Sequence, residues 1–278
     1  MLKVRAPKFD FSQIKAHWAP NKEFAQGFNA SSLIPAYVEP YLLKVMKMAQ
    51  AKVDPSKTRL IEEIDIFCKQ EMQHMRQHKA FNNVLRSQGY EGLQPLEDKI
   101  AAEYEDWLKT RSLRFNLAYC EGFESMSASA CEAWFEDYGD LLEGADPVVA
   151  DMWRWHLAEE FEHRTVCSDV YHELSGLNPL FRYVYRVYGY IYALVHLGNF
   201  SKSAAAYLLA KDRETMTPEE VEASIARQKA IGERIKRSAM PMLIKVISPF
   251  YDPAKRRTPR GQLEFLASFE QRRQAAPA

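Results

Sequence analysis

Two stretches of the chain, QEMQHMRQH at residues 70–78 and WHLAEEFEHR at residues 155–164, repeat one short spacing. Each contains Glu-x-x-His, formed by Glu71 with His74 and by Glu160 with His163. Residues three apart on an α-helix lie about 60° apart around its axis and one turn along it. The carboxylate and the imidazole of each pair can therefore reach the same metal ion, or bridge two ions.

The sequence around these stretches predicts long helices, because Gly and Pro interrupt the chain only at wide intervals. After an irregular segment over residues 1–30, we expect helices over about 32–52, 56–89, 96–145 (a short helix, then a long one) and 147–174. Asp146-Pro147 and Thr217-Pro218 each place a capping side chain before a Pro at the first helical position. No segment alternates with the period of a strand. We therefore predict one all-α domain, with a four-helix bundle over about 32–176 and additional C-terminal helices over about 177–278.

Composition excludes several classes of protein. Lys plus Arg and Asp plus Glu both number 37, and this balance argues against a partner nucleic acid found by bulk electrostatics. The most apolar stretch, at 187–197, is shorter than the roughly 20 residues that span a bilayer, so we expect no stable membrane insertion. The cysteines form no CxxC pair, which favours free thiols in the cytoplasm: Cys68, Cys120, Cys131 and Cys167. The basic residues of the tail are expected to form a solvated surface: Lys255, Arg256, Arg257 and Arg260.

A metal site in a four-helix bundle usually takes one Glu from each of the other two helices. Glu121 lies in the largely apolar NLAYCEGFESM, where a carboxylate is costly unless it is paired or bound to metal. Glu124, one turn on, is the alternate, and a pairing of Glu121 with an Arg such as Arg114 is the rival interpretation. Glu39 is the one acid in IPAYVEPYLLKVM, where it either binds metal or caps the first helical turn. The expected ligands are Glu39, Glu71, His74, Glu121, Glu160 and His163.

Two further histidines share the expected metal-facing side. His78 follows His74 by one helical turn, and His156 precedes Glu160 by one turn. Each is either an extra ligand or a hydrogen-bond partner of a ligand. Four carboxylates with two imidazoles suit two iron or manganese ions better than zinc in a thiolate site. We expect two iron ions, with manganese or zinc as alternatives.

Longer strings around the same residues resemble a known family. QEMQHMRQHKAFN (70–82), the helical Glu121 and LLEGADPVVADMWRWHLAEEFEHRTVCSDVY (141–171) are similar to the ferritin-like family of predicted metal-dependent hydrolases. The resemblance covers about 33–174, and more loosely SPFYDP at 248–253. It implies a ferritin-like bundle around a two-metal carboxylate site, with Glu71, His74, Glu121, Glu160 and His163 as ligands. The chain departs from the family in Val-Glu-Pro-Tyr around Glu39, and in Asp252 where a His is frequent.

Three functions are compatible with such a site. The first expectation is an O2-dependent di-iron oxidoreductase, an oxygenase or oxidase acting on a small apolar organic substrate with an electron-donor protein. The alternative is a two-metal hydrolase, in which the ions bind hydroxide and polarise a carbonyl or phosphoryl group, as the family name implies. The second alternative is iron binding or storage without turnover. A homodimer is left open.

Overall fold

The computed structural model describes residues 2–275, and every regular element in that range is helical. The prediction of an all-α fold is confirmed. The helices are α1 (Lys22–Ser32), α2 (Pro35–Gln50), α3 (Thr58–Ser87), α4 (Gln94–Thr110), α5 (Leu113–Glu136), α6 (Gly139–Leu142), α7 (Pro147–His163), α8 (Val166–Leu174), α9 (Pro179–Arg213), α10 (Pro218–Val246) and α11 (Gln262–Ala275). Two short 3-10 turns, η1 (Glu91–Leu93) and η2 (Pro253–Lys255), lie between them.

Three helix boundaries differ from those expected. The long helix expected to end near 145 stops at Glu136, and the separate α6 follows it. The segment expected to be irregular contains α1, which the Asn21 side chain caps by accepting a hydrogen bond from Phe24 N. The helix expected over 147–174 is divided into α7 and α8 at Arg164–Thr165. Arg164 donates to the carbonyl of Phe161 at 2.6 Å, and this bond satisfies an acceptor that the ending helix leaves free.

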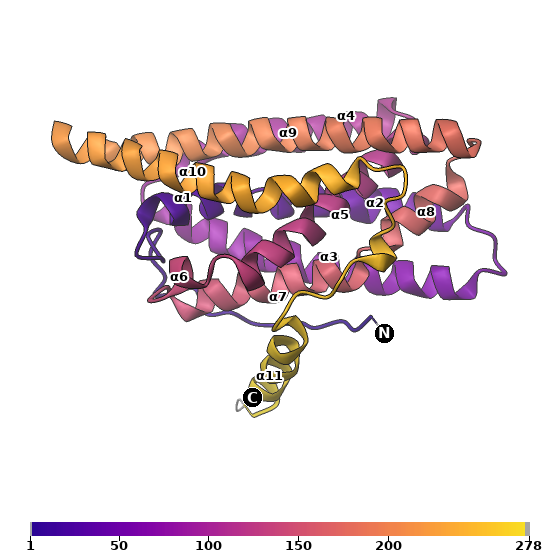
Figure 1. Cartoon of the computed structure of the whole chain (residues 1–278), viewed down its shortest axis with the longest axis horizontal. Coiled ribbons are helices and arrows are strands. Elements are labelled where there is room, and N and C mark those ends of the chain that lie inside the picture. Colours follow the sequence, from indigo (N-terminus) through magenta and orange to yellow (C-terminus); the bar gives the residue numbers. More distant parts are fainter. Residues whose placement is uncertain (1, 276–278) are drawn as a thin grey trace.

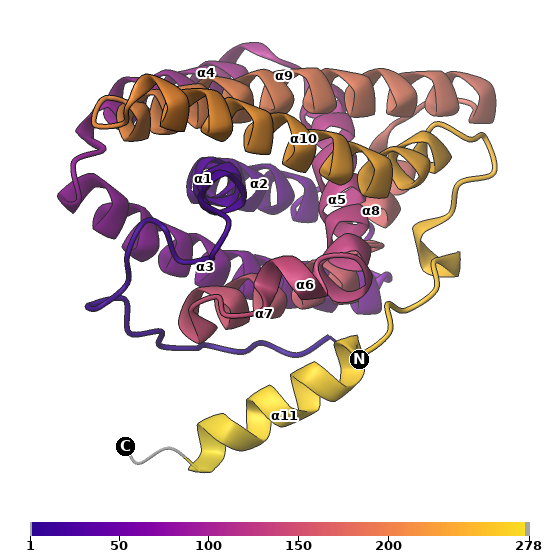
Figure 2. The same ribbon diagram turned by 60° about the vertical axis from the view of Figure 1, so that its left-hand side comes forward.

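Four helices form the bundle that carries the site. α2 packs along α3, α5 packs along α7, and the contacts of α2 with α5 and of α3 with α7 close the ring. Figure 2 shows α1 and α2 nearly end-on. Other helices surround them: α3, α7, α5, α9 and α4. The side chains that α2 directs toward α3, α5 and α7 are thus enclosed by protein on all sides.

The long helices α9 and α10 cover the bundle on one side (Figure 1). α9 crosses α5 at two glycines that permit close backbone contact. A Cβ on Gly122 would lie 2.7 Å from Tyr190 Cα, and a Cβ on Gly189 would lie 2.5 Å from the carbonyl oxygen of Ala118. Any larger residue at either position would force the helices apart.

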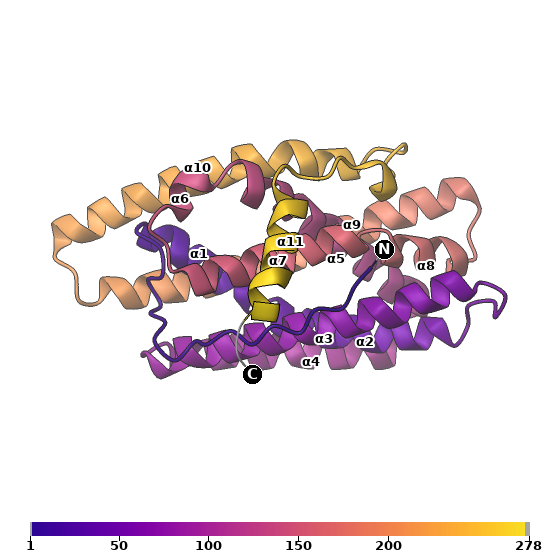
Figure 3. The ribbon, with the colours of Figure 1, turned by 90° about the horizontal axis from the view of Figure 1, so that it is seen from below.

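The two ends of the chain meet on the opposite side. The N-terminal segment runs along α3 and α7, and α11 lies across α7 (Figure 3). Arg5 joins them through ion pairs at 3.0 Å to Glu159, 2.7 Å to Glu162 and 2.7 Å to Glu270. Since Arg5 and Glu159 are both buried, their ion pair belongs to the interior, whereas Glu162 and Glu270 are partly exposed.

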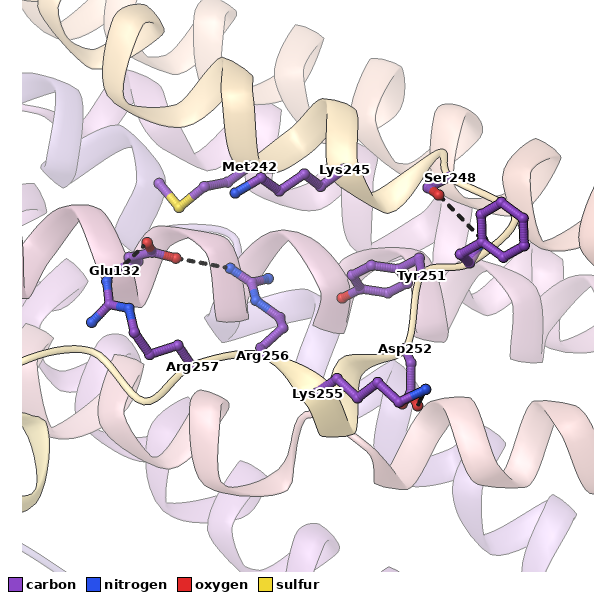
Figure 4. A pocket seen from close by; sticks show the side chains of 10 residues that line it. Glu132, Met242, Lys245, Ser248, Tyr251, Asp252, Lys255, Arg256 and Arg257 are labelled. Carbon is purple, nitrogen blue, oxygen red and sulfur yellow. Dashed lines mark hydrogen bonds and ion pairs between the residues drawn. The ribbon is translucent and has the colours of Figure 1, made fainter.

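The described residues answer three smaller expectations. All four cysteines are buried and free. No helix within residues 2–275 is long and apolar enough to cross a membrane. The basic tail is solvated only in part: Lys255 and Arg260 are exposed, but Arg256 folds back onto α5, donating to Ser129 Oγ at 2.9 Å and lying 3.5 Å from Glu132. Arg256 lines a polar cavity of about 390 Å³ below α10 (Figure 4).

Candidate metal centre

Seven buried side chains from α2, α3, α5 and α7 converge inside the bundle. They form two groups, Glu39 with His74, His156 and Glu160, and Glu71 with Glu124, Glu160 and His163. Within each group the potential ligand atoms lie within 4.8 Å of one another. Glu160 belongs to both groups, so the arrangement offers two cation positions that share one carboxylate.

The two oxygens of Glu160 face different groups. Oε1 lies 3.4 Å from Nδ1 of His74 and 3.2 Å from Nε2 of His156. Oε2 lies 3.6 Å from Nε2 of His163, which in turn is 3.1 Å from Oε1 of Glu71. A carboxylate that presents one oxygen to each group has the geometry of a bridging ligand.

Hydrogen bonds on the outer side of two imidazoles fix their protons. Nε2 of His74 lies 3.0 Å from Oε2 of Glu159, which can only accept, so this nitrogen carries the proton. Nδ1 of His163 lies 3.1 Å from Oε1 of Gln70, whose amide nitrogen is turned to the Lys3 carbonyl. Nδ1 of His74 and Nε2 of His163 therefore point inward, toward the carboxylates. Burial acts to lower the pKa of both imidazoles, but the surrounding carboxylates raise it well above the ordinary value, so that without metal these nitrogens hold protons among the acids.

The third imidazole is fixed by a longer chain of hydrogen bonds. Ser32 Oγ donates to Oδ1 of Asn82 at 2.8 Å, so it can only accept from Nδ1 of His78, also at 2.8 Å. Nε2 of His78 is then a lone pair and accepts from Nδ1 of His156 at 2.5 Å. The remaining nitrogen of His156, Nε2, faces Glu160 and Glu39 without a proton.

The inward atoms lack protein partners. Among the described residues, both carboxylate oxygens of four acids, Nδ1 of His74 and Nε2 of His163 are buried without a hydrogen bond: the acids are Glu39, Glu71, Glu124 and Glu160. Leaving that many buried carboxylate oxygens unsatisfied is costly, and carboxylates that face one another repel. Four carboxylates also balance the charge of two divalent cations. The residues present therefore fit a two-metal centre.

The electrostatics of the group support this fit. Burial, with the neighbouring carboxylates, raises the pKa of Glu39, Glu71 and Glu124 above the ordinary value. Burial also acts to raise the pKa of Glu160, but the surrounding imidazoles, His163 foremost, hold it well below. Burial lowers the pKa of His156 to about 4, which leaves its imidazole neutral at neutral pH. Divalent cations would displace protons from the three raised carboxyls and relieve their mutual repulsion.

The structure brings together five of the six residues in the expected set: Glu39, Glu71, His74, Glu160 and His163. It also adds the two alternates Glu124 and His156. His78 stands behind His156 and belongs to neither group. Ligation of metal by these side chains is still a prediction, which their convergence supports.

Glu121 does not lie with the others. Its Oε1 is 3.6 Å from Nη1 of Arg186 on α9 and accepts a bond from Ser125, and it belongs to neither group. The rival interpretation of a pairing with arginine describes it better, although the partner is Arg186 and not Arg114. The reason is the crossing of α9 at Gly122, because Glu124 lies about 200° around α5 from that glycine and so faces away from α9.

Sequence reasoning missed the residues that hold the imidazoles in place: Glu159, Gln70, Ser32 and Asn82. The helical wheel of α7 directs Glu159 away from the other acids. On that side of α7, its carboxylate contacts the outer nitrogen of His74 from α3. One signal was present, since a polar side chain next to a Glu-x-x-His on a buried helix is costly unless it has a partner. Arg5, which pairs with Glu159, gave no local signal at all.

Comparison with known proteins now identifies the family. A family model described as "Predicted metal-dependent hydrolase" matches residues 3–257. The chain belongs to this family. The match extends well beyond the region in which the sequence resembles the family most clearly, and takes in α9, α10 and the segment after them. It supports metal dependence and a hydrolase, and it does not support the di-iron oxidoreductase that was the first expectation. No curated protein and no solved structure matches the chain.

Proposed function

We propose that this member of the predicted metal-dependent hydrolases is a two-metal enzyme that hydrolyses a small organic substrate. Its two ions would be held by the group of Glu39 and His156 and by the group of Glu71 and Glu124, with Glu160 shared between them. Divalent ions in such a centre polarise a carbonyl or phosphoryl oxygen and lower the pKa of water.

One observation carries the proposal. Three imidazoles each have their outer nitrogen engaged, so that the inner nitrogens of His74, His156 and His163 face the acids. Those nitrogens lie 3.1–3.6 Å from carboxylate oxygens. Carboxylates and imidazoles buried this close together are stable when cations lie between them, and two divalent ions can replace the protons that fill this role in the metal-free protein.

The surrounding residues orient the donors and exclude water. Glu159, itself paired with Arg5, holds the ring of His74, and Gln70 holds that of His163. The rings of Trp155 and Phe67 pack edge-on against the same two imidazoles, with centroids 4.8 and 4.7 Å apart. This apolar packing keeps bulk water from the donors and strengthens electrostatic interactions among them.

A second candidate function has an observation of its own. All seven candidate ligands come from helices, with Glu-x-x-His on two of them, which is the ligand pattern of di-iron and di-manganese carboxylate proteins. The same residues would then serve O2-dependent oxidation, with two iron ions and an electron-donor protein. Carboxylate and imidazole donors accept iron, manganese and zinc, so the donor types leave both chemistries open.

Metal content and reactivity, measured together, separate the two candidates. The protein would be freed of metal, loaded with manganese, zinc or anaerobic Fe(II), and analysed for metal per chain. Hydrolysis of neutral esters by the manganese or zinc form, without O2 consumption, supports the proposal. A loaded protein that hydrolyses no ester or amide, but whose Fe(II) form consumes O2 with a transient visible band, would replace it with the oxidoreductase. Fewer than two ions per chain would contradict both.

A further inference from the structure

A cavity of about 260 Å³ reaches the candidate metal centre from the side of α1, α5, α7 and α9. Of the seven candidate ligands, His156 is the one that lines it. His156 is 2% exposed, and its Nε2 lies 3.2 Å from the shared Glu160. A molecule in this cavity would thus be in contact with a ligand of the centre.

The walls of the cavity are mostly apolar, with three serines among them: Ser31, Ser127 and Ser201. The apolar residues include Phe28 from α1, Phe123 and Met126 from α5, Trp153 and Leu157 from α7, and Leu197 from α9. No Asp, Glu, Lys or Arg is among its lining residues. A charged group entering it would lose its hydration without gaining a partner of opposite charge from these walls, whereas an apolar group would be transferred out of water favourably.

We propose that this cavity is the substrate pocket, and that it takes an uncharged apolar group about the size of an aryl ring or a short branched alkyl chain. This inference rests on the proposed function, since the cavity is useful to hydrolysis only if the centre holds metal. The size follows from volume, because an apolar cavity of about 150 Å³ in another protein already accepts benzene. The substrate class is then a neutral ester or amide whose apolar side enters the cavity while its carbonyl meets the centre.

The chain offers a residue that can close the pocket without disturbing the centre. Gly198 lines the cavity, is exposed, and has no atom within 4 Å of the place where a Cβ would lie. Gly198→Leu therefore adds a side chain in open space, and leucine also suits a helix better than glycine. Gly232→Leu on α10 is the matched control, because that helical glycine also has open space and does not line the cavity.

The first test uses binding, which needs no turnover. Manganese-loaded protein would be titrated calorimetrically with indole, a neutral aromatic probe, and with tryptamine, its ammonium-bearing analogue. We expect indole to bind, tryptamine to bind at least tenfold more weakly, Gly198→Leu to weaken indole at least tenfold, and Gly232→Leu to leave it unchanged. No binding of indole, equal binding of tryptamine, or an unaffected Gly198→Leu variant would each overturn the pocket. Two ions per chain in wild-type protein and both variants show that the centre is intact.

The second test measures kcat/KM for 4-nitrophenyl acetate, propionate and butyrate. Each added CH2 should raise kcat/KM by about fourfold while the acyl chain of the ester still fits the pocket. Gly198→Leu should reduce this dependence of kcat/KM on acyl length. A flat series in wild-type protein would overturn the substrate class. Binding of indole by a protein that takes up no metal would instead overturn the proposed function and leave an apolar pocket without it, so the two failures are distinguishable.

Discussion

Nδ1 of His156 donates to Nε2 of His78 across 2.5 Å, and this one contact decides which nitrogen of His156 faces the acids. His78 can accept because Ser32 holds its other nitrogen protonated, and Ser32 is held in turn by Asn82. His78, a candidate ligand by its helical spacing, thus lies behind His156 and is placed to orient it. If the centre holds metal, this contact would leave Nε2 of His156 free to bind it.

Replacing His78 should therefore weaken metal binding by the group around Glu39 more than metal binding by the group around Glu71. In His78→Phe we expect one of two manganese ions to bind about 10–100-fold more weakly, which is the usual effect of removing a partner of a ligating imidazole. Calorimetric titration of metal-free protein would show two ions of similar affinity becoming one strong and one weak. Equal weakening of both ions would mean that His78 acts only through general stability.

Glu124 and Glu121 form a matched pair on one helix. Glu124→Gln should reduce manganese to about one ion per chain, because it removes a charged donor from the group around His163. Glu121→Gln should keep two ions, since Glu121 faces Arg186 instead. It should destabilise the fold by about 1–3 kcal/mol, the usual cost of weakening a buried polar contact, since Arg186 keeps its hydrogen bonds to the carbonyls of Val246 and Ser248. Elemental analysis and urea unfolding give the two readouts, and metal loss in Glu121→Gln would contradict the geometry described above.

Metal should stabilise the fold through Glu160. Since the native state alone assembles both groups, manganese at about 100 times its Kd should add about 2.7 kcal/mol to the free energy of unfolding for each ion bound. The melting temperature of metal-free protein should then rise by several degrees on addition of manganese, as calorimetry would record. In Glu160→Ala, which lacks the shared ligand, manganese should leave the melting temperature unchanged while the helical circular dichroism stays near that of wild type. A manganese-dependent rise in that variant would show that the ions bind elsewhere.

A surface contact gives a pH dependence that is independent of the centre. Hydrogen bonds from Arg257 lower the pKa of Glu136 to about 2. Because the pKa is lower in the folded state, this carboxyl stabilises the fold fully at a pH above its unfolded-state pKa of 4.5. The contribution disappears as the pH falls toward 2. Glu136→Gln should therefore lower the free energy of unfolding at pH 7 by less than about 1 kcal/mol, given solvent screening, and should match wild type near pH 2. Urea unfolding of metal-free protein checks this, with the exposed Glu143→Gln as the control.

The part of the site that sequence could predict is the part governed by a single helix. Glu71 with His74, and Glu160 with His163, meet because three residues span about one turn, whatever surrounds them. The choice between Glu121 and Glu124 depends on the approach of α9 at Gly122 and Gly189, which is a property of two helices at once. Local spacing carries no information about that contact, so both acids were reasonable candidates.

The fold shows the same division. The capping signals at Asp146 and Thr217 marked the starts of α7 and α10 correctly, because a cap acts within one turn. The end of α7 was not visible, since the Arg164 side chain that satisfies its last carbonyls is also anchored to the carbonyl of Pro253, far along the chain. Long-range contacts of this kind decide where a helix with good local propensity stops.

The ion pairs of Arg5 have a consequence for how the protein is made. Arg5 leaves the ribosome well before its partners, because Glu159 and Glu270 follow it by 154 and 265 residues. Contacts so distant in sequence form late in folding, because the chain must first lose the conformational entropy of closing a long loop before the contact stabilises it. Arg5 therefore cannot steady His74 through Glu159 until 154 further residues have been translated. Ions arriving before then would meet an incomplete set of ligands, because Glu160 and His163 follow Glu159 in the chain.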